Sequence, residues 1–123
     1  MALGFDSKTP IYQQIAEDIR RRIVEGELRA GDQLMSTTQY ATTYRINPAT
    51  ANKAFNQLTA EGIIFKQRGI GMFVTDDAAA ILRGEGRQSY AGERLAPAIR
   101  EGLALGYTPE HIRALVNDIL EEK

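Results

Sequence analysis

Apolar residues recur at three- and four-residue steps over most of the chain, a spacing typical of amphipathic helices packed against a core. The first such stretch runs from Pro10 to about Gly26 and carries isoleucine at every fourth position: Ile11, Ile15, Ile19 and Ile23. Thr9 is expected to cap this helix, with Pro10 at its first position, where a missing N–H costs little. Its last two turns hold three arginines that complement the helix dipole, although a solvated face is the simpler interpretation of them: Arg20, Arg21 and Arg22.

Two further helices are expected to follow at close spacing. The first of them begins after Ser36, a good N-cap residue, and runs to about Tyr44 with Tyr40 directed inward. Residues 34–35 before it are suited to a very short strand, and residues 45–46 after it make a tight turn. Two short helices joined by so few residues form a helix-turn-helix pattern.

The next stretch reads N-P-A-T-A-N-K-A-F-N-Q-L-T-A-E-G, and both of its ends are well signalled. Asn47 is a good N-cap, Pro48 suits the first helical position, and Gly62 is a stop. The inward face is apolar: Ala51, Ala54, Phe55 and Leu58. The outward face carries small or amide side chains and one cation: Ala49, Thr50, Asn52, Lys53, Asn56 and Gln57. Such a face suits close approach to base edges and phosphates.

After Gly62 the pattern changes from a helical to a strand period. Residues 63–65 and 72–74 are apolar runs, and the glycine-bearing segment between them is basic, which predicts a β-hairpin. A hairpin after a helix-turn-helix makes a winged helix, whose tip is expected to carry Lys66 and Arg68. A nucleotide-binding loop is excluded, because no G-K-[ST] follows and the segment leads into a strand.

The C-terminal part predicts two more helices. Residues 76–105 favour a helix that kinks or breaks at Gly84–Gly86 unless packing overrides it, since a glycine in a helix interior costs about 1 kcal/mol. Thr108 is expected to cap a last helix with Pro109 at its first position. These helices cannot bury their apolar stripes alone, so pairing with a second copy is expected. The residues expected in that interface are Leu95, Ile99, Leu103, Ile112, Leu115, Val116 and Ile119.

The predicted fold is therefore mainly α with a small β-hairpin. A winged helix-turn-helix domain is expected over residues 1–75, followed by a two-helix dimerisation tail over residues 76–123. The net charge of −1 does not indicate a generally basic protein, but its distribution is uneven. The first part holds nine Lys/Arg against seven Asp/Glu (+2) and the second holds six against nine (−3). The first part is thus the better candidate for binding an anionic partner.

Several function classes find no support in the sequence. There is no cysteine, which removes disulfides and thiolate metal sites and fits a reducing cytoplasm. The first ten residues lack the features of a secretory signal, and no run of 18 apolar residues suggests a membrane span, so a cytoplasmic location is expected. His111 is the single histidine, and no nucleophile has a base partner at a recognisable spacing. We therefore expect no enzyme activity, no metal and no cofactor.

With this arrangement of elements, the chain resembles the GntR family of bacterial transcription regulators. The resemblance covers Pro10 to Val74 and rests on P-I-Y-Q-Q-I, G-E-L-R-A-G-D-Q-L, I-N-P-A-T-A-N-K-A-F, L-T-A-E-G-I-I and R-G-I-G-M-F-V. The short tail is similar to that of the YtrA-type subfamily. The resemblance implies a homodimer that binds a palindromic operator in double-stranded DNA, usually as a repressor. Whether a small-molecule effector exists, and which one, stays open, and no polar group in the tail clearly marks a ligand pocket.

The resemblance, together with side-chain chemistry, gives a set of expected DNA contacts. The start of the second helix and the residue after its end are expected to contact the DNA backbone: Ser36, Thr37, Thr38 and Arg45. The third helix is expected to face a groove with Asn47, Ala49, Thr50 and Lys53, and the wing to contact the minor groove or its phosphates with Arg68 and Gly69. Simpler roles are also open: Asn47 as a cap only, Thr50 as a filler of the first turn, and Tyr40 and Tyr44 as packing residues.

The chain departs from the family pattern at two positions. Where the family usually reads L-P-S-x-R, this chain reads L-M-S-T-T, so Met35 replaces the turn proline and Thr38 an arginine that typically contacts DNA. A bidentate arginine–base contact is worth about 1–3 kcal/mol of discrimination, so the operator sequence and the affinity stay open. The alternative function is a winged-helix module that binds protein and not DNA; a small hydrolase would need a nucleophile–base pair that the sequence does not show.

Overall fold

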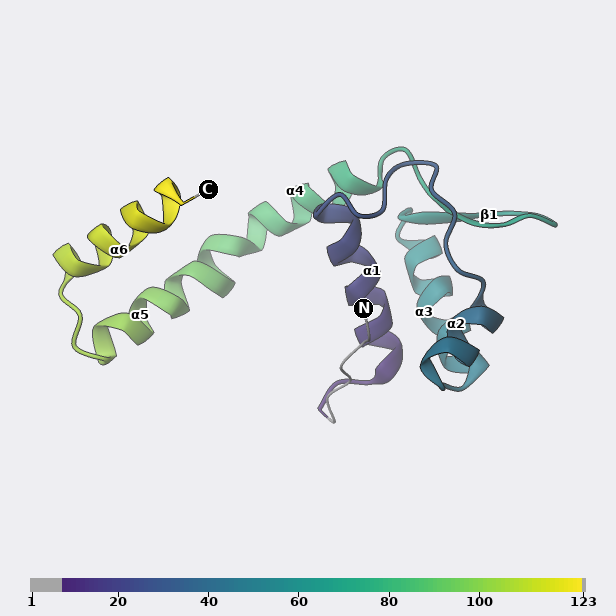
Figure 1. Ribbon diagram of the computed structural model, residues 1–123, viewed down its shortest axis with the longest axis horizontal. Coiled ribbons are helices and arrows are strands. Elements are labelled where there is room, and N and C mark those ends of the chain that lie inside the picture. The colour runs from purple at the N-terminus through teal and green to yellow at the C-terminus, as the bar shows by residue number, and fades with distance from the viewer. Residues whose placement is uncertain (1–7, 123) are drawn as a thin grey trace. The chain divides into compact units, whose positions relative to one another are not determined.

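The computed structural model describes residues 8–122, which form two compact units, one up to Gly84 and one from Glu85. The elements in chain order (Figure 1) are α1 (Ile11–Val24), α2 (Thr37–Tyr44), α3 (Pro48–Ala60), β1 (Ile64–Gln67), β2 (Gly71–Val74), α4 (Ala78–Tyr90), the π-helix η1 (Ala91–Leu95), α5 (Ala96–Ala104) and α6 (Pro109–Glu121). This mainly helical fold with one small hairpin confirms the predicted fold class.

The core of the first unit lies where α1 and α2 pack against α3 (Figure 1). Three of the four periodic isoleucines of α1 are buried there, and the predicted inward residues of α3 are buried against them. The hairpin covers the core through Ile64 and Val74. The core continues beyond residue 75, the boundary expected from the sequence, because Ala78 and Leu82 at the start of α4 are also buried.

Local capping interactions fix the ends of α2 and α3 as the sequence predicts. The Ser36 Oγ accepts from the backbone N–H of Gln39 at 3.0 Å, and the Gln39 side chain accepts from the N–H of Ser36 at 3.2 Å. This capping box satisfies two N–H groups that the first helical turn leaves unpaired. The Asn47 Oδ1 accepts from the N–H of Ala49 at 2.8 Å, with Pro48 at the first position of α3.

Two expectations for the N-terminal half were wrong in detail. Pro10, and not Thr9, is the N-cap of α1, because Pro10 has an extended ψ of 141° and the helix begins at Ile11. The short strand expected at residues 34–35 is instead a single bridge between Gln33 and Phe73. Pairing ends there because the chain then turns into the cap of α2.

The hairpin pairs Ile64 with Val74 at one end and Gln67 with Gly71 at the other. Lys66 lies opposite Met72 within this ladder, so it belongs to a strand and not, as expected, to the tip. The tip is the turn of residues 68–70, in which Gly69 has a φ of 79°, a left-handed value that glycine adopts without steric cost.

The helix break expected at Gly84–Gly86 is wrong, because α4 continues through both glycines. The irregularity lies downstream, in the π-helix η1, where the N–H of Ala96 donates to the carbonyl of Ala91. Pro97 explains this position: it has no N–H, and its ring would clash with the carbonyl four residues earlier in a regular α-helix. A single π-turn ahead of Pro97 relieves that clash.

The three consecutive arginines of α1 are engaged in ion pairs. Arg20 contacts Glu61 at the end of α3 with an Nη2–Oε2 distance of 2.8 Å. Arg21 contacts Asp18 at 2.8 Å, and Arg22 contacts Glu27 at 3.2 Å. These partly solvated pairs agree with the simpler interpretation of the triplet, a charged outer face of α1.

Candidate nucleic-acid interface

Three parts of the first unit line one groove of about 310 Å³. The start of α2 contributes Ser36 and Thr37, α3 contributes the polar side chains of Asn52, Asn56 and Thr59, and the hairpin contributes Lys66. The full lining is Ser36, Thr37, Asn52, Phe55, Asn56, Thr59, Lys66, Gly71 and Met72. The start of α2, the outer face of α3 and the hairpin are therefore presented to the same space.

The outer face of α3 is polar and accessible along its length. Ala49 and Lys53 are exposed, and Thr50 is half-buried in the first turn. The Lys53 ammonium lies 4.2 Å from the centroid of the Tyr12 ring of α1, a cation–π contact that holds the charge at the surface of the unit. Gln57 is directed elsewhere, because its amide donates to Glu61 at 3.2 Å.

Asn47 performs the capping role that its sequence position suggests, since its Oδ1 is occupied by the N–H of Ala49. Tyr40 and Tyr44 also have packing roles. Their ring centroids lie 4.7 Å apart, and Tyr40 meets the edge of Phe55 at 5.8 Å.

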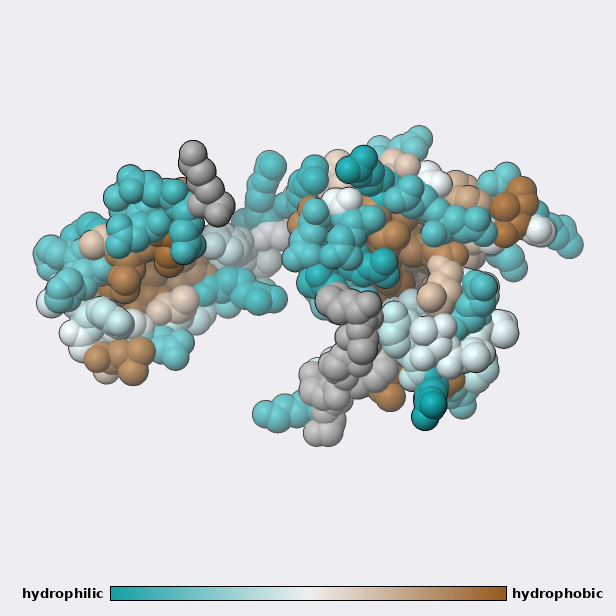
Figure 2. Space-filling model, in the orientation of Figure 1, coloured by the Kyte–Doolittle hydropathy of each residue, from teal (hydrophilic) through white to brown (hydrophobic). Residues whose placement is uncertain are grey.

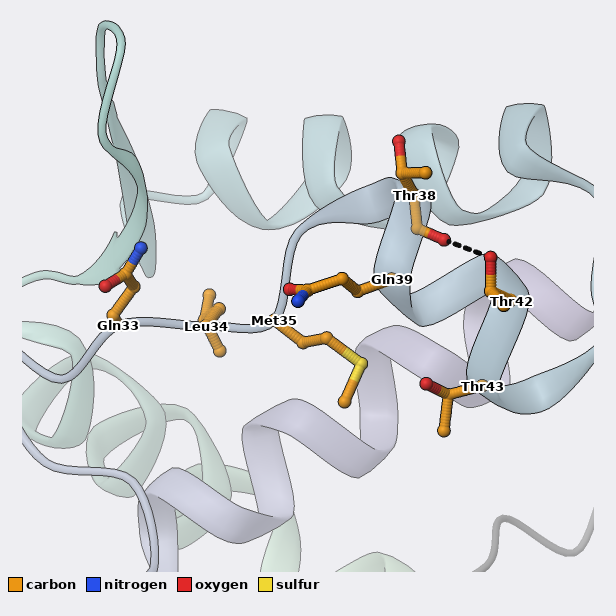
Figure 3. Close-up of a pocket in the computed structure, with 7 residues that line it drawn as sticks. All are labelled: Gln33, Leu34, Met35, Thr38, Gln39, Thr42 and Thr43. Carbon is orange, nitrogen blue, oxygen red and sulfur yellow. Dashed lines mark hydrogen bonds between the residues drawn. The ribbon is translucent and has the colours of Figure 1, made fainter.

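The outer side of α2 has a shallow, uncharged cavity of about 700 Å³ (Figure 3). Its lining is Gln33, Leu34, Met35, Thr38, Gln39, Thr42 and Thr43. Thr38 is exposed, and its carbonyl accepts from the Thr42 hydroxyl at 3.0 Å. Arg45, at the other end of α2, is also exposed and adopts a left-handed conformation with φ 55°.

The hairpin tip carries the remaining expected contact residues. Arg68 and Gly69 are both exposed. The tip is tied to the body of the unit, because the Gln33 Nε2 donates to the carbonyl of Ile70 at 3.0 Å. The structure thus brings Ser36, Thr37, α3 and the hairpin to one side of the unit, whereas Thr38 lines the cavity on the outer side of α2.

The second unit is a helical hairpin with an exposed apolar surface (Figure 2). α6 is capped by Thr108, whose Oγ1 accepts from the N–H of His111 at 3.2 Å, as the sequence predicts. α5 and α6 come close at Gly102, where a Cβ would lie in ordinary contact, 3.4 Å from the Ile112 Cδ1. None of the apolar residues of α5 and α6 is buried, and Ile119 is 65% exposed.

Comparison with known proteins identifies the class of molecule that has this arrangement. The family described as bacterial regulatory proteins, gntR family, matches residues 11–74, which are the helix-turn-helix and the hairpin. The chain belongs to the GntR family.

Relatives along the whole chain agree with this assignment. The transcriptional repressor YtrA of Bacillus subtilis is 33% identical over 92% of this chain and 86% of its own length. A transcriptional regulator from Oenococcus oeni has a similar structure, with a TM-score of 0.75, 32% identity and 98% of both chains covered. BusR of S. agalactiae, solved in complex with its busAB-promotor DNA, has a TM-score of 0.54 at 30% identity over 91% of this chain and 56% of its own.

Membership of the GntR family makes the chain a DNA-binding transcription regulator and not an enzyme. Residues 8–122 contain no group of three or more His, Cys, Asp or Glu side chains placed to hold a metal ion. His111 instead packs edge-on against Tyr107, with ring centroids 6.4 Å apart. None of the helices described is long and apolar enough to cross a membrane.

Sequence reasoning did not select all the groove residues of this GntR regulator. Asn52 and Asn56 line the groove and were recognisable only as members of a polar helix face. The sequence does not show that Lys66 and Met72 of the hairpin line the same groove as these two asparagines. Gln33 was missed altogether, and no local signal could have found it, because its partner at the hairpin tip is 37 residues away.

Proposed function

We propose that this GntR regulator acts in the cytoplasm as a homodimeric repressor that binds a palindromic operator through the groove-lining face of each first unit. The observation that carries the proposal is the common groove of α2, α3 and the hairpin, which is lined by polar side chains and the Lys66 ammonium. A winged helix that reads DNA needs its recognition helix, here α3, and its wing on the same side of the domain.

In the proposed complex α3 enters the major groove. Ala49 and Thr50 lie in its first turn, where recognition helices contact base edges, and their small side chains allow close approach. Lys53, one turn further on, is placed to contact a phosphate. Asn47 contributes by fixing the start of α3 and thereby the depth at which the helix enters.

The flanking contacts hold the domain on the DNA backbone. Ser36, Thr37 and Thr38 lie at the N-terminus of α2, where backbone N–H groups and the helix dipole favour phosphate oxygens. Arg45 is exposed after the last turn of α2, and Arg68 with Gly69 forms the exposed hairpin tip that we assign to the minor groove or its phosphates. The uncharged cavity beside α2 gives no chemical reason to assign a small-molecule effector.

The proposal is tested by titrating the full chain against its own upstream DNA at several salt concentrations. Binding should weaken steeply as salt rises, because each phosphate contact that a cation neutralises releases counterions. Lys53→Ala and Arg68→Ala should each lower the affinity and reduce the slope of log K against log [salt] by about 1.

Arg113→Ala is the matched control, because Arg113 is a solvated cation of α6 whose nearest carboxylate oxygen, on Glu110, is 3.9 Å away. It should leave both the affinity and the slope unchanged. If Lys53→Ala and Arg68→Ala bind as tightly as the parent chain, the proposed surface is wrong.

A further inference from the structure

The segment that leads into α2 is joined to the hairpin by one bridge and the backbone hydrogen bonds beside it. Gln33 pairs with Phe73 as an isolated antiparallel bridge. The N–H of Leu34 donates to the carbonyl of Met72 at 2.8 Å, and the N–H of Val74 donates to the carbonyl of Asp32 at 3.0 Å. These backbone bonds hold the base of the hairpin but do not reach its tip.

The side chain of Gln33 extends this attachment to the tip. Its Nε2 donates to the carbonyl of Ile70 at 3.0 Å, one residue after Gly69 in the turn. Figure 3 shows the amide directed at the hairpin, apart from the side chains of α2. Gln33 itself is solvent-exposed and contributes nothing to the apolar core.

Gly71 provides the space for this contact. A Cβ at position 71 would lie 2.6 Å from the Gln33 Nε2 and 3.5 Å from its Cδ, so any larger residue there would push the amide away. Gly71 also has a φ of 149°, which other residues rarely adopt. The contact between Gln33 and the hairpin tip therefore depends on a glycine at position 71.

We propose that Gln33 is a positioning residue for DNA binding, which fixes the hairpin tip relative to α2 so that Arg68 meets the DNA together with α3. This inference rests on the proposed function. The segment that carries Gln33 reaches the N-cap of α2, Ser36, three residues later, so one side-chain hydrogen bond links the wing to a second DNA-contacting element. A tip that is ordered before binding loses less conformational entropy in the complex.

The test replaces Gln33 by methionine, which keeps the length of the side chain and removes the donor without adding a charge. One neutral hydrogen bond corresponds to an affinity loss of about threefold to tenfold. The loss should disappear when Arg68→Ala is already present, since the tip then has no cation to position. It should persist when Lys53→Ala is present, because Lys53 lies on α3.

Gln88→Met, the same change at an exposed position of α4, is the matched control and should leave the affinity unchanged. If Gln33→Met binds like the parent chain, or costs the same with and without Arg68, the positioning role is overturned while the proposed function stands. If neither Lys53→Ala nor Arg68→Ala weakens binding, the proposed function fails instead.

A second readout does not depend on DNA. Amide hydrogen exchange of residues 68–71 in the free protein should become faster in Gln33→Met, while the exchange of the α1 and α3 core amides stays unchanged. Unchanged exchange at the tip would show that the Gln33 amide does not restrain it, and would overturn the inference whatever the DNA titrations give.

Discussion

Arg45 is the single non-glycine residue with a positive φ among residues 8–122, with a value of 55°. It ends α2 in a left-handed conformation, and its N–H donates to the carbonyl of Ala41. A left-handed residue with a Cβ costs about 1–2 kcal/mol, a strain that glycine at the same position would avoid. The position therefore retains a cation at a cost in stability, which is consistent with the proposed phosphate contact.

Arg45→Gly and Arg45→Ala separate these two effects. Both variants lose the guanidinium and should bind operator DNA equally weakly. Arg45→Gly should be more stable than Arg45→Ala by about 1 kcal/mol, because only glycine relieves the backbone strain. Urea denaturation of the two variants measures the difference; equal stabilities would contradict the strain argument.

Tyr40 is a buried packing residue whose hydroxyl has no hydrogen-bond partner within residues 8–122. Burial raises the pKa of this hydroxyl above its ordinary value of 10.0, and the nearby Asp18 and Tyr44 raise it further while Arg22 opposes them. The unpaired hydroxyl costs desolvation free energy without a compensating bond.

Tyr40→Phe should therefore raise the free energy of unfolding by about 1 kcal/mol near neutral pH. The pH dependence gives a second check. Above about pH 10 the unfolded chain releases the Tyr40 proton and the folded chain retains it, so the parent chain loses stability as the pH rises. Tyr40→Phe should lose less over the same alkaline range, and parallel pH curves for the two proteins would contradict this account.

At the scale of elements, helix α4 continues through two glycines that the sequence suggested would interrupt it. Gly84 and Gly86 have helical conformations, and a Cβ at either position would meet no atom within 4 Å. Packing of Ala78 and Leu82 in the core anchors the start of α4, and this tertiary burial outweighs the low propensity of the glycines.

Gly84→Ala and Gly86→Ala should each stabilise the protein by about 0.4–1 kcal/mol, because alanine fits the helix and restricts the unfolded chain. Thermal melts followed by circular dichroism measure the effect. Gly31→Ala is the matched control: a Cβ there also meets open space, but its φ of 84° is left-handed, so the same change should destabilise. A loss of stability in both α4 variants would contradict the argument that alanine fits the helix at these two positions.

At the scale of the whole molecule, the second unit exposes the apolar side chains from which the sequence predicted dimerisation. Leu95, Leu103, Leu115, Val116 and Ile119 are each between 39% and 65% exposed. Ile99 and Ile112 are partly covered within the unit. Exposed apolar surface of this kind marks an interaction site, and a second copy is the partner that the proposed palindromic operator would require.

Leu115→Glu combined with Ile119→Glu should convert the dimer to a monomer in sedimentation experiments. Operator affinity should fall by about a hundredfold or more, since the two half-sites no longer bind as one unit. Ala114→Glu places a single glutamate on the opposite face of α6 and should remain dimeric. A dimer that survives the double change would place the interface elsewhere.

Local sequence signals were enough to predict most of the elements and several of their ends. Capping by Ser36 and Asn47, the stop at Gly62 and the isoleucine period of α1 act over a few residues, and the structure confirms each of them. Pro97 is an equally local signal for the irregular turn before it. The irregularity was instead predicted at Gly84–Gly86, from the low helix propensity of glycine.

Only the tertiary structure decided what those elements present to a partner. The groove joins residues from 36 to 72, the Arg20–Glu61 pair spans 41 residues and the Gln33–Ile70 bond spans 37. Such contacts depend on how α1, α3 and the hairpin pack, and most of the residues involved are polar, so no apolar period marks them. Local physics therefore predicts which helices form, and packing alone selects which of their polar faces share one surface.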